Sequence, residues 1–435
     1  MTDQTDRAGA VAPPDRIGPM ARREMGLAYG MLLPTFAIVL AIVLGPLLAN
    51  FWISFKPVGL GDLRPASLFV NERIRGDLEE PGAIATLQYR LRNSSQDKAI
   101  HGAGFTDTLP DGLTVIGEPD ERCQVTGQVI TCFLGEIEAR HRETIEIEVT
   151  ADAAYVANPV SPRDSEAQSS GTSENILTNF EFTFENFARI FSSSDFWSVL
   201  RVTLYYPVFG TAGALIVGLF AAQLLNSAFR GRSVLRGLFL FPYVAPVIAV
   251  AFTWIVLLDP FSGTLNSILR QMDVIDGPIN FFGQRSVPLN LFGLTIDFPV
   301  ALSTVIAFEA WRYFPLSFLF ILARMQSLSS EMYEAAEIDG ATPLQQFWYI
   351  SLPQLVGILA VLFLLRFIWT FNKFDDIFLL TGGAAGTRTL TVDVYYQGFA
   401  IGNLGAGAAV AVVIFVMLLI FALLYFRAMP KGEGL

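Results

Sequence analysis

Long apolar blocks constrain the fold of this chain more than any other feature. Six of them run at roughly residues 27–53, 196–224, 234–258, 300–322, 355–371 and 406–425. An α-helix needs about 20 apolar residues to cross the hydrocarbon core of a bilayer, and each block is near that length. Of all residues in the chain, 52% are apolar, and their arrangement in uninterrupted runs is typical of membrane proteins. We therefore expect an all-α membrane protein with six transmembrane helices.

Basic residues beside these blocks predict the side of the membrane on which each loop lies. Short loops rich in Lys and Arg stay in the cytoplasm. The basic residues precede the first block, join the second and third, and follow the fourth and the sixth: Arg16, Arg22, Arg23, Arg230, Arg232, Arg236, Arg324 and Arg427. They predict cytoplasmic tails over 1–25 and 429–435 and a first helix over 26–56. The first block is too long for the apolar part of a signal peptide, so we expect it to be retained.

Between the first two blocks the sequence predicts a β domain and linker over residues 57–179, outside the cytoplasm. Residues 85–92 and 144–150 alternate strictly between apolar and polar side chains, which indicates half-buried strands. Turn residues lie between these two stretches, at 109–112 and at Gly127. Residues 158–175 are rich in Ser, Pro and charge, and we interpret them as a flexible linker. Residues 61–178 hold 20 acidic and 10 basic side chains, and so carry nearly all of the net charge of -11.

The two cysteines of the chain fall in this segment. If Gly127 and Gln128 form a two-residue hairpin turn, Cys123 lies directly opposite Cys132. A disulfide across the hairpin would suit an oxidising periplasm, and two free thiols are the alternative. The segment also resembles the immunoglobulin-like β-sandwich repeats of bacterial surface proteins, in residues 106–113 and in the strand that begins at Thr144.

A polar elbow separates the fourth block from the fifth. Residues 334–340 read Glu-Ala-Ala-Glu-Ile-Asp-Gly, and after nine more residues 350–353 read Ile-Ser-Leu-Pro. Ser330 is expected to cap a short helix that Gly340 ends in the left-handed conformation. Thr342 then starts a second short helix with a capping box to Gln345 and a proline at the first helical position. The pattern predicts two helices with a fixed bend.

This spacing resembles the cytoplasmic coupling motif of the membrane subunits of bacterial ATP-driven (ABC) importers. The resemblance implies a permease core over 180–428, with a cytoplasmic coupling loop over 324–353 that docks on an ATPase subunit. An ordinary solvated loop helix is the alternative. The residues that would make the ATPase contact are Glu334, Ala335, Ala336, Asp339, Gly340, Ile350, Leu352 and Pro353.

Further stretches resemble the carbohydrate-importer permeases of the maltose and glycerol-phosphate type. They are residues 311–313, 323–328, 371–377, 380–383, 389–390 and 395–396. That family usually has proline after the glycine pair, where this chain has Ala384, so the outer loop is expected to differ. The maltose-type permease carries an extracytoplasmic immunoglobulin-like insertion at the equivalent point, which there touches the binding protein. The resemblance implies the same contact for residues 61–178.

Polar and aromatic side chains within the spans are the candidates for a solute pathway, because polar groups in a membrane cost free energy unless they face a cavity or a partner. Glu309 and Arg312 are three residues apart, and a pair between them is the structural alternative. Aromatic side chains suit sugars, although packing or interface anchoring explains many of them. The candidates are Tyr205, Tyr243, Trp254, Glu309, Trp311, Trp369, Asn372 and Asp375.

The sequence thus predicts a non-catalytic permease subunit of an importer in the bacterial inner membrane. It contains no phosphate-binding loop of the Walker type, so ATP hydrolysis belongs to another chain. Expected partners are a second homologous permease, two copies of an ATPase subunit, a periplasmic or lipid-anchored solute-binding protein and membrane lipid, with no nucleic acid and no cofactor. A sugar or oligosaccharide is the favoured cargo, with glycerol phosphate, polyols or another small solute as alternatives. The alternative from a different functional class is a membrane-anchored sensor or adhesion protein.

Overall fold

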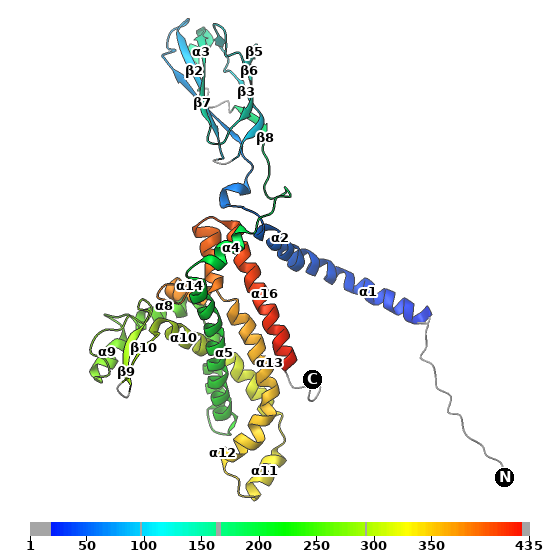
Figure 1. The fold of residues 1–435 in the computed structure, drawn as a ribbon, viewed down its shortest axis with the longest axis vertical. Coiled ribbons are helices and arrows are strands. Elements are labelled where there is room, and N and C mark those ends of the chain that lie inside the picture. The colour runs from blue at the N-terminus through cyan, green and yellow to red at the C-terminus, as the bar shows by residue number, and fades with distance from the viewer. Residues whose placement is uncertain (1–18, 96–97, 162–166, 292–293, 429–435) are drawn as a thin grey trace, which may run out of the picture. The chain divides into compact units, whose positions relative to one another are not determined.

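The computed structural model of the chain describes residues 19–95, 98–161, 167–291 and 294–428 (Figure 1). The cytoplasmic tails expected at the two ends therefore lie largely outside the described residues. The chain divides into two compact units, Met1–Trp52 and Ile53–Leu435.

The described residues of the N-terminal unit form a single run of helix. It begins as α1 (Pro19–Val39), passes through a π-helical turn (Leu40–Leu44) and continues as α2 (Gly45–Ser54), whose last residues enter the second unit. Residues Arg23–Ser54 are long and apolar enough to cross a membrane, in line with the first predicted span.

Two four-stranded sheets follow in the chain and share one hydrophobic core. The first sheet has the order β1-β2-β7-β4 and the second the order β5-β6-β3-β8. Tyr89 and Ile147 of the first sheet and Phe105 and Ile130 of the second are buried in the same cluster. The strands are β1 (Leu68–Arg75), β2 (Ile84–Asn93), β3 (Ile100–Thr108), β4 (Leu113–Val115), β5 (Cys123–Thr126), β6 (Val129–Ile137), β7 (Arg142–Ala151) and β8 (Gln168–Thr172), with helix α3 (Ala153–Ala157) after β7.

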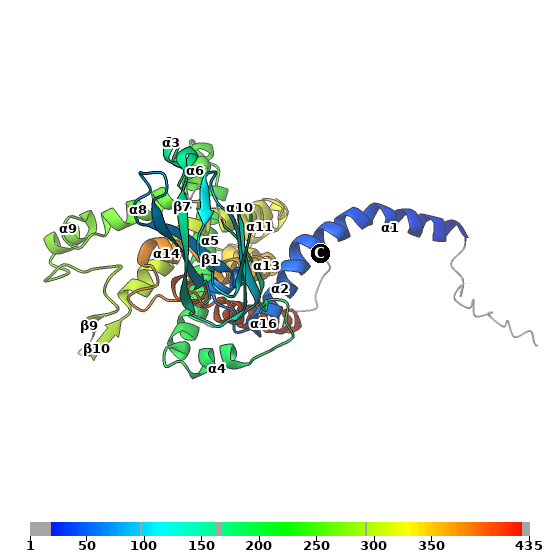
Figure 2. The same cartoon turned by 90° about the horizontal axis from the view of Figure 1, so that it is seen from above.

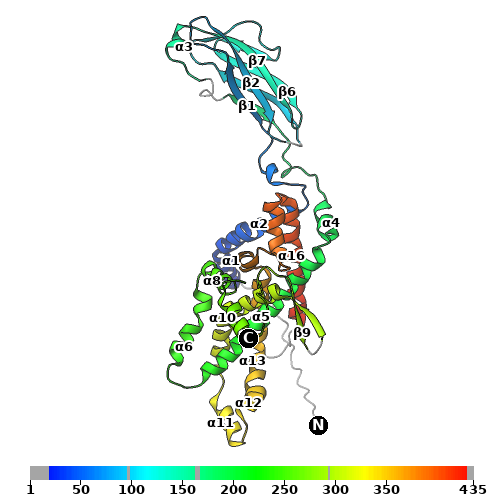
Figure 3. The same cartoon turned by 90° about the vertical axis from the view of Figure 1, so that its left-hand side faces the viewer.

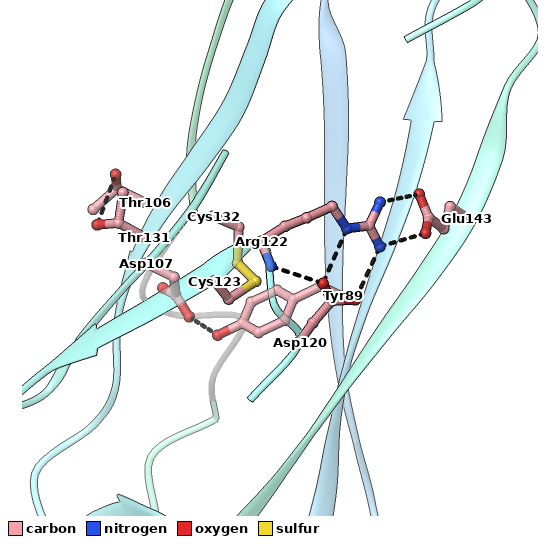
Figure 4. Close-up of a disulfide and its surroundings, with 9 residues drawn as sticks. All are labelled: Tyr89, Thr106, Asp107, Asp120, Arg122, Cys123, Thr131, Cys132 and Glu143. Carbon is pink, nitrogen blue, oxygen red and sulfur yellow. Dashed lines mark hydrogen bonds and ion pairs between the residues drawn. A yellow bond between two sulfur atoms is a disulfide. The ribbon is translucent and has the colours of Figure 1, made fainter. Parts of the chain in front are cut away.

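Period-two alternation located the strands β2 and β7 correctly. β7 buries Ile145, Ile147 and Val149 and exposes the residues between them, because successive side chains of a strand point to opposite faces. The turn at Gly127 is also as predicted, with a positive φ of 64°. It pairs β5 with β6 so that Cys123 lies opposite Cys132, and the structure joins the two sulfur atoms (Figure 4).

The prediction of a flexible linker over 158–175 is wrong for the second half of that range. Residues Gln168–Thr172 form β8, which pairs antiparallel with β3 at the edge of the second sheet. All five residues are exposed. The strand is held through its backbone, so its polar side chains carry no alternation from which it could be recognised.

Polar side-chain contacts also join the strands, both within the core and at the surface. The Tyr89 hydroxyl donates to the Asp107 carboxylate at 2.6 Å, within the core and between the two sheets. At the sandwich edge, the Arg122 guanidinium bonds to Asp120 at 2.9 Å and to Glu143 of β7 at 2.6 Å (Figure 4). The hydrogen bond from Arg122 lowers the pKa of Asp120 to about 2.

The remaining residues of the second unit are mainly helical (Figure 3). α5 and α10 pack along their length, and small residues allow the approach: a Cβ added at Gly218 would meet the Ser317 Cβ at 2.7 Å. The helices are α4 (Glu185–Ser192), α5 (Phe196–Asn226), α6 (Arg232–Phe239), α7 (Phe241–Val244), α8 (Val247–Leu257), α9 (Thr264–Gln271), α10 (Val300–Gln326), α11 (Ser330–Ile338), α12 (Pro343–Gln346), α13 (Leu352–Phe371), α14 (Asp375–Thr381), α15 (Leu390–Tyr395) and α16 (Leu404–Ala428). A hairpin of β9 (Val287–Leu291) and β10 (Leu294–Phe298) lies with α9 to one side of these helices (Figure 2).

The described residues contain five helices long and apolar enough to cross a membrane. The predicted third span is not a straight helix, because Arg232–Val244 and Val247–Leu257 meet at a bend of 92°. The break falls at Ala245 and Pro246, where proline removes a backbone donor and disfavours helix in the residue before it. The total is six if this bent pair is one span.

Candidate functional site

Two regions of the helical part contain features that helix packing alone does not require. One is the elbow between α10 and α13, which comprises residues 327–353. The other is a group of charged side chains buried among α5, α10, α13 and α14, here called the charge cluster.

The elbow begins as predicted, with one correction. Ser329, not Ser330, caps α11: its backbone is extended and its hydroxyl accepts from the Glu331 N–H at 3.3 Å. Ser330 is already the first helical residue, so its own side chain lies one position too late for the cap. Gly340 follows the helix with φ +79°, the left-handed conformation that glycine adopts without strain.

The second half of the elbow differs from the separate helix that was expected. Thr342 and Gln345 form the predicted capping box, with Pro343 between them. However, α12 continues through a π-helical turn (Phe347–Ser351) directly into α13, so Pro343–Phe371 is one helical run of 29 residues. Pro353 lies just after the π turn, which re-routes backbone hydrogen bonds where proline has no N–H to donate. The bend at Gly340 is thus attached directly to a spanning helix.

A hydrogen bond braces the two arms of the elbow. The Tyr333 hydroxyl of α11 lies 2.9 Å from the Ser351 hydroxyl, and Ser351 is 2% exposed. Near the bend, apolar side chains are exposed, including Ile338 at 87% and Leu344 at 67%. Apolar side chains gathered at the tip of a loop mark a surface that meets a partner.

The charge cluster centres on Glu309 of α10, which is fully buried. One carboxylate oxygen accepts from the Arg366 guanidinium and, at 2.7 Å, from the Thr370 hydroxyl. The other accepts from the Tyr206 hydroxyl of α5 at 3.0 Å. Charge-assisted bonds of this kind offset the cost of placing a carboxylate in an apolar environment.

A second ion pair lies next to the first. The Lys373 ammonium is 2.7 Å from the Asp376 carboxylate of α14 and 3.8 Å from Glu309. The Tyr313 ring lies between the cations, with its centroid 4.1 Å from the Arg366 guanidinium carbon and 3.5 Å from the Lys373 ammonium nitrogen. Two acidic and two basic groups therefore lie around one aromatic ring, and a third cation, Arg312, has its guanidinium carbon 5.5 Å from the centroid of the same ring.

The pair between Glu309 and Arg312 that sequence spacing offered does not form. Arg312 instead donates to the carbonyl oxygens of Pro242 at 3.4 Å and Ala245 at 3.3 Å. These carbonyls lie at the bend between α7 and α8, where the broken helix leaves them without helical partners. Arg312 thus stabilises the bend, and Glu309 is left to Arg366.

Comparison with known proteins gives the family of these helices. Residues 214–430 match the family described as the binding-protein-dependent transport system inner membrane component. The chain is 34% identical over 250 residues to the inner membrane ABC transporter permease protein YcjO of Escherichia coli, covering 57% of this chain and 80% of that protein. The chain belongs to this transport family.

Two further relatives carry the names of transport systems. The chain is 33% identical to the trehalose/maltose transport system permease protein MalF of Thermococcus litoralis, over 56% of this chain and 77% of that protein. It is 30% identical to the sn-glycerol-3-phosphate transport system permease protein UgpA of Agrobacterium fabrum, over 57% of this chain and 80% of that protein. The chain is therefore the membrane permease subunit of an ABC importer, a non-catalytic chain that relies on a separate ATPase.

The permease brings together only some of the predicted pathway residues. Trp254 of α8 and Trp311 of α10 are half-buried with ring centroids 5.5 Å apart, whereas Glu309 lies two residues before Trp311, on another face of α10. The remaining aromatic candidates are more exposed: Tyr205 at 50%, Tyr243 at 41% and Trp369 at 47%. Asn372 and Asp375 are exposed too, and the Asn372 amide donates back to the Ile368 carbonyl at 2.9 Å.

Sequence reasoning missed several members of the cluster as site residues. Tyr313, Thr370 and Asp376 were not among the predicted pathway residues. The Lys373 and Asp376 spacing of three residues was one available clue, since residues three apart on a helical turn can pair. Arg366, the one basic residue in its span, was a second.

Proposed function

We propose that this permease forms half of the translocation pathway for a sugar or oligosaccharide. A second homologous permease supplies the other half, and two copies of an ATPase subunit bind on the cytoplasmic side. A solute-binding protein delivers the cargo from outside. The family description, a membrane component that depends on a binding protein, supports this arrangement.

The elbow is the observation that carries the proposal. Its exposed tip, its left-handed Gly340 and its direct continuation into a spanning helix make it suited to receive force from an ATPase. We assign the ATPase contact to the residues of the motif, Glu334, Ala335, Ala336, Asp339, Gly340, Ile350, Leu352 and Pro353. In this role the bend moves as one body with α13, and α13 carries Arg366 of the charge cluster.

The orientation of the permease follows from its basic loops. Arg230 and Arg232 lie just after α5 and Arg324 lies in the last turn of α10, at ends that the positive-inside rule assigns to the cytoplasm. The same rule puts both termini and the elbow in the cytoplasm. The β domain then faces the periplasm, an environment that maintains a disulfide such as the one between Cys123 and Cys132.

The pairing of Arg366 and Lys373 with carboxylates favours a neutral cargo. Arg366 and Lys373 each have a carboxylate partner, so neither is available to neutralise a phosphate without first leaving Glu309 or Asp376. A neutral polyhydroxylated solute needs only hydrogen-bonding groups and aromatic surface, for which the half-buried Trp254 and Trp311 and the exposed Tyr205 and Tyr243 are the candidates. The trehalose/maltose name of one relative agrees with this choice, and glycerol phosphate remains the second candidate because another relative carries that name.

The coupling role is tested with two variants of Gly340. No heavy atom lies within 4 Å of a Cβ added there, so a substitution causes no clash and acts through the positive φ alone. Asn tolerates the left-handed conformation, whereas a β-branched residue does not. In the complex reconstituted in lipid, G340V is expected to keep ATPase activity but lose most solute uptake, while G340N keeps both. Equal uptake by the two variants, or failure of any ATPase to copurify with the permease, refutes the role.

The cargo is tested by ATPase stimulation in the same complex. Candidate sugars and glycerol 3-phosphate are added with the solute-binding protein, to the intact chain and to a chain lacking residues 61–178. Stimulation by a sugar supports the proposal, and stimulation by the phosphate alone refutes it. A loss of stimulation on deletion gives the β domain a docking role, whereas unchanged stimulation reduces it to an accessory.

A further inference from the structure

A cavity of about 260 Å³ lies where α4, α5, α15 and α16 come together, and it shares no lining residue with the elbow or the charge cluster. α4 packs against α16 and against the start of α5 (Figure 3). Pockets for drug-sized ligands are typically about 300–1,000 Å³, so this one suits a small polar group better than an oligosaccharide. Its polar lining is of mixed charge: Arg189, Arg388, Asp195, Asp393, Ser193 and Gln397. We call it the α4 cavity.

Arg388 is held in the cavity wall with one donor unused. One terminal nitrogen of its guanidinium donates to the Asp393 carboxylate, and the guanidinium carbon lies 4.7 Å from the centroid of the Tyr396 ring. These two contacts fix the plane of the group. Its Nε is buried and has no hydrogen-bond partner within the part of the chain that the structure describes. Because a buried N–H without a partner costs free energy, Nε is a ready donor for an anion in the cavity.

Asp195 supplies the opposite charge. It immediately precedes α5, and its carboxylate makes no capping bond to that helix. Among the described residues the carboxylate forms no hydrogen bond or ion pair. The negative charge of Asp393 is close enough to act on it. Like charges repel, so a cation beside Asp195 is stabilised.

The other charges of the cavity already have partners. Arg189 bonds to Glu185, one turn earlier in α4, at 3.1 Å. Arg388 and Asp393 form an ion pair with each other. The charged groups left for a ligand are therefore the Arg388 Nε and the Asp195 carboxylate. A ligand that satisfies both carries an anionic and a cationic group, whereas a simple anion meets repulsion from Asp195.

The α4 cavity lies at the end of a spanning helix. α5 is long and apolar enough to cross a membrane from its first residue, Phe196, which lines the cavity. The Phe196 ring contacts the exposed rings of Phe191 and Trp197 edge-on, with centroids 5.1 and 5.4 Å apart. Exposed aromatic side chains at the end of a span, Trp in particular, lie at the level of the lipid headgroups.

From these observations we infer that the α4 cavity binds the headgroup of a zwitterionic phospholipid with a primary ammonium, the chemistry of phosphatidylethanolamine. The phosphodiester accepts from the Arg388 Nε, and the ammonium donates to the Asp195 carboxylate. The acyl chains lie along the exposed Phe191 and Trp197 rings. Free phosphoethanolamine has the same polar groups, but only the lipid uses this aromatic rim. The inference goes beyond the proposed function and depends neither on the cargo nor on coupling to an ATPase.

The test measures lipid binding to the complete importer complex by native mass spectrometry in detergent. Phosphatidylethanolamine, phosphatidylcholine and phosphatidylglycerol with the same acyl chains are titrated separately. We expect phosphatidylethanolamine to bind roughly ten-fold more tightly than either of the others. The quaternary ammonium of phosphatidylcholine donates no N–H hydrogen bond to Asp195, and phosphatidylglycerol carries no cation.

Two variants address the two contacts separately. R388K keeps a cation for Asp393 but removes the Nε donor, and D195N keeps the shape of the side chain but removes its charge. Each should weaken phosphatidylethanolamine binding roughly ten-fold. The matched controls are R201K and D297N, at exposed positions outside the cavity. They should change the affinity less than about two-fold, because exposed charges contribute little.

Several outcomes overturn the inference. One is equal affinity of the wild type for the three lipids, and another is unchanged affinity in both R388K and D195N. A loss of the same size in R201K and D297N would indicate a general effect of surface charge. Displacement of the lipid by free phosphoethanolamine at a comparable concentration would assign the cavity to a soluble ligand.

Assembly and transport are measured in parallel. Copurification of the ATPase subunit shows that each variant folds, and the ranking of the three lipids on the wild type needs no substitution at all. If this ranking fails while G340V and G340N behave as proposed, the lipid site is refuted and the coupling role stands. If the ranking holds while the Gly340 variants transport equally, the coupling role fails alone.

Discussion

Arg366 of α13 donates a hydrogen bond to Glu309 of α10, with the two side chains only 2% and 0% exposed. The two residues are separated by 57 positions in the chain and belong to different spanning helices. A buried pair of this kind ties two helices together only while both charges are present. The ion pair therefore holds α10 and α13 together. α13 is also the helix that continues from the elbow.

Replacing one partner of the Arg366–Glu309 ion pair should destabilise the permease more than replacing both partners. In R366M the Glu309 carboxylate loses its main cation, and we expect a loss of roughly 3–5 kcal/mol. In E309Q/R366M no buried charge from this pair is left alone, so most of that loss should be recovered. Thermal unfolding of the purified complex measures both, and additive losses in the double variant would contradict the coupling.

Arg312 provides a test of the bend between α7 and α8. Its guanidinium donates to the carbonyls of Pro242 and Ala245 at the 92° break. R312L leaves both carbonyls without these donors, at a cost of about 1–3 kcal/mol each if water does not replace them. Hydrogen exchange should accelerate over α8 in R312L and less in R312K, which keeps a donor. Unchanged exchange in R312L would show that the bend is held by packing alone.

The hydrogen bond between Tyr333 and Ser351 should matter for coupling rather than for assembly. Y333F removes the hydroxyl and keeps the ring, so α11 and the start of α13 lose their direct polar link. We expect solute transported per ATP to fall several-fold while the ATPase subunit still copurifies. Y349F is the matched control, because that tyrosine is 80% exposed on the same elbow. Equal effects of the two substitutions would argue against a brace.

The parts of this fold that could be predicted are those in which the pattern of apolar and polar residues matches the burial of their side chains in the structure. The alternation of β2 and β7, the apolar blocks and the capping box at Thr342 each follow from neighbours in sequence. β8 was missed because its exposed polar residues are held by backbone pairing with β3.

The partner of Glu309 could not be predicted for a different reason. The spacing in sequence favoured Arg312, yet the tertiary packing of α10 against α13 gave the carboxylate a stronger partner in Arg366. The same packing left Arg312 to the carbonyls at the bend. Spacing along one helix does not reveal which other helix packs against it. The ion pair between Glu309 and Arg366 therefore depends on a tertiary contact that the sequence pattern does not show.

The disulfide between Cys123 and Cys132 should contribute to the stability of the β domain. The cysteines are nine positions apart, and closing a loop of that size is worth about 2–3 kcal/mol in the chain-entropy model. C123S/C132S is therefore expected to lower the unfolding temperature of the β domain while leaving the helical part unchanged. Hydrogen exchange of β5 and β6 in the full chain measures this, with reductant on the wild type as an independent route. Equal protection with and without the bridge would contradict the expectation.

Glu72 makes the stability of the β domain depend on pH. Its side chain is only 5% exposed, and one carboxylate oxygen accepts from the Ala167 N–H at 3.1 Å. Burial, and then the negative charge of Asp107, raise the pKa of Glu72 from 4.5 to about 7. A carboxyl with a raised pKa binds more protons in the folded state than in the unfolded state, so its contribution is full below pH 4.5 and is lost as pH rises towards 7.

Replacing Glu72 by the neutral isostere Gln should remove this dependence. Between about pH 4.5 and 7 the wild type should lose a few kcal/mol of stability, since a pKa difference of one corresponds to about 1.4 kcal/mol. E72Q should lose little over the same range and be the more stable protein at pH 8. Protection factors for the amides of β1 and β2, measured in the full chain at several pH values, give the comparison. E148Q, at an exposed position on the outer face of β7, serves as the control and should follow the wild type. A wild type whose protection is flat across this range would contradict the raised pKa of Glu72.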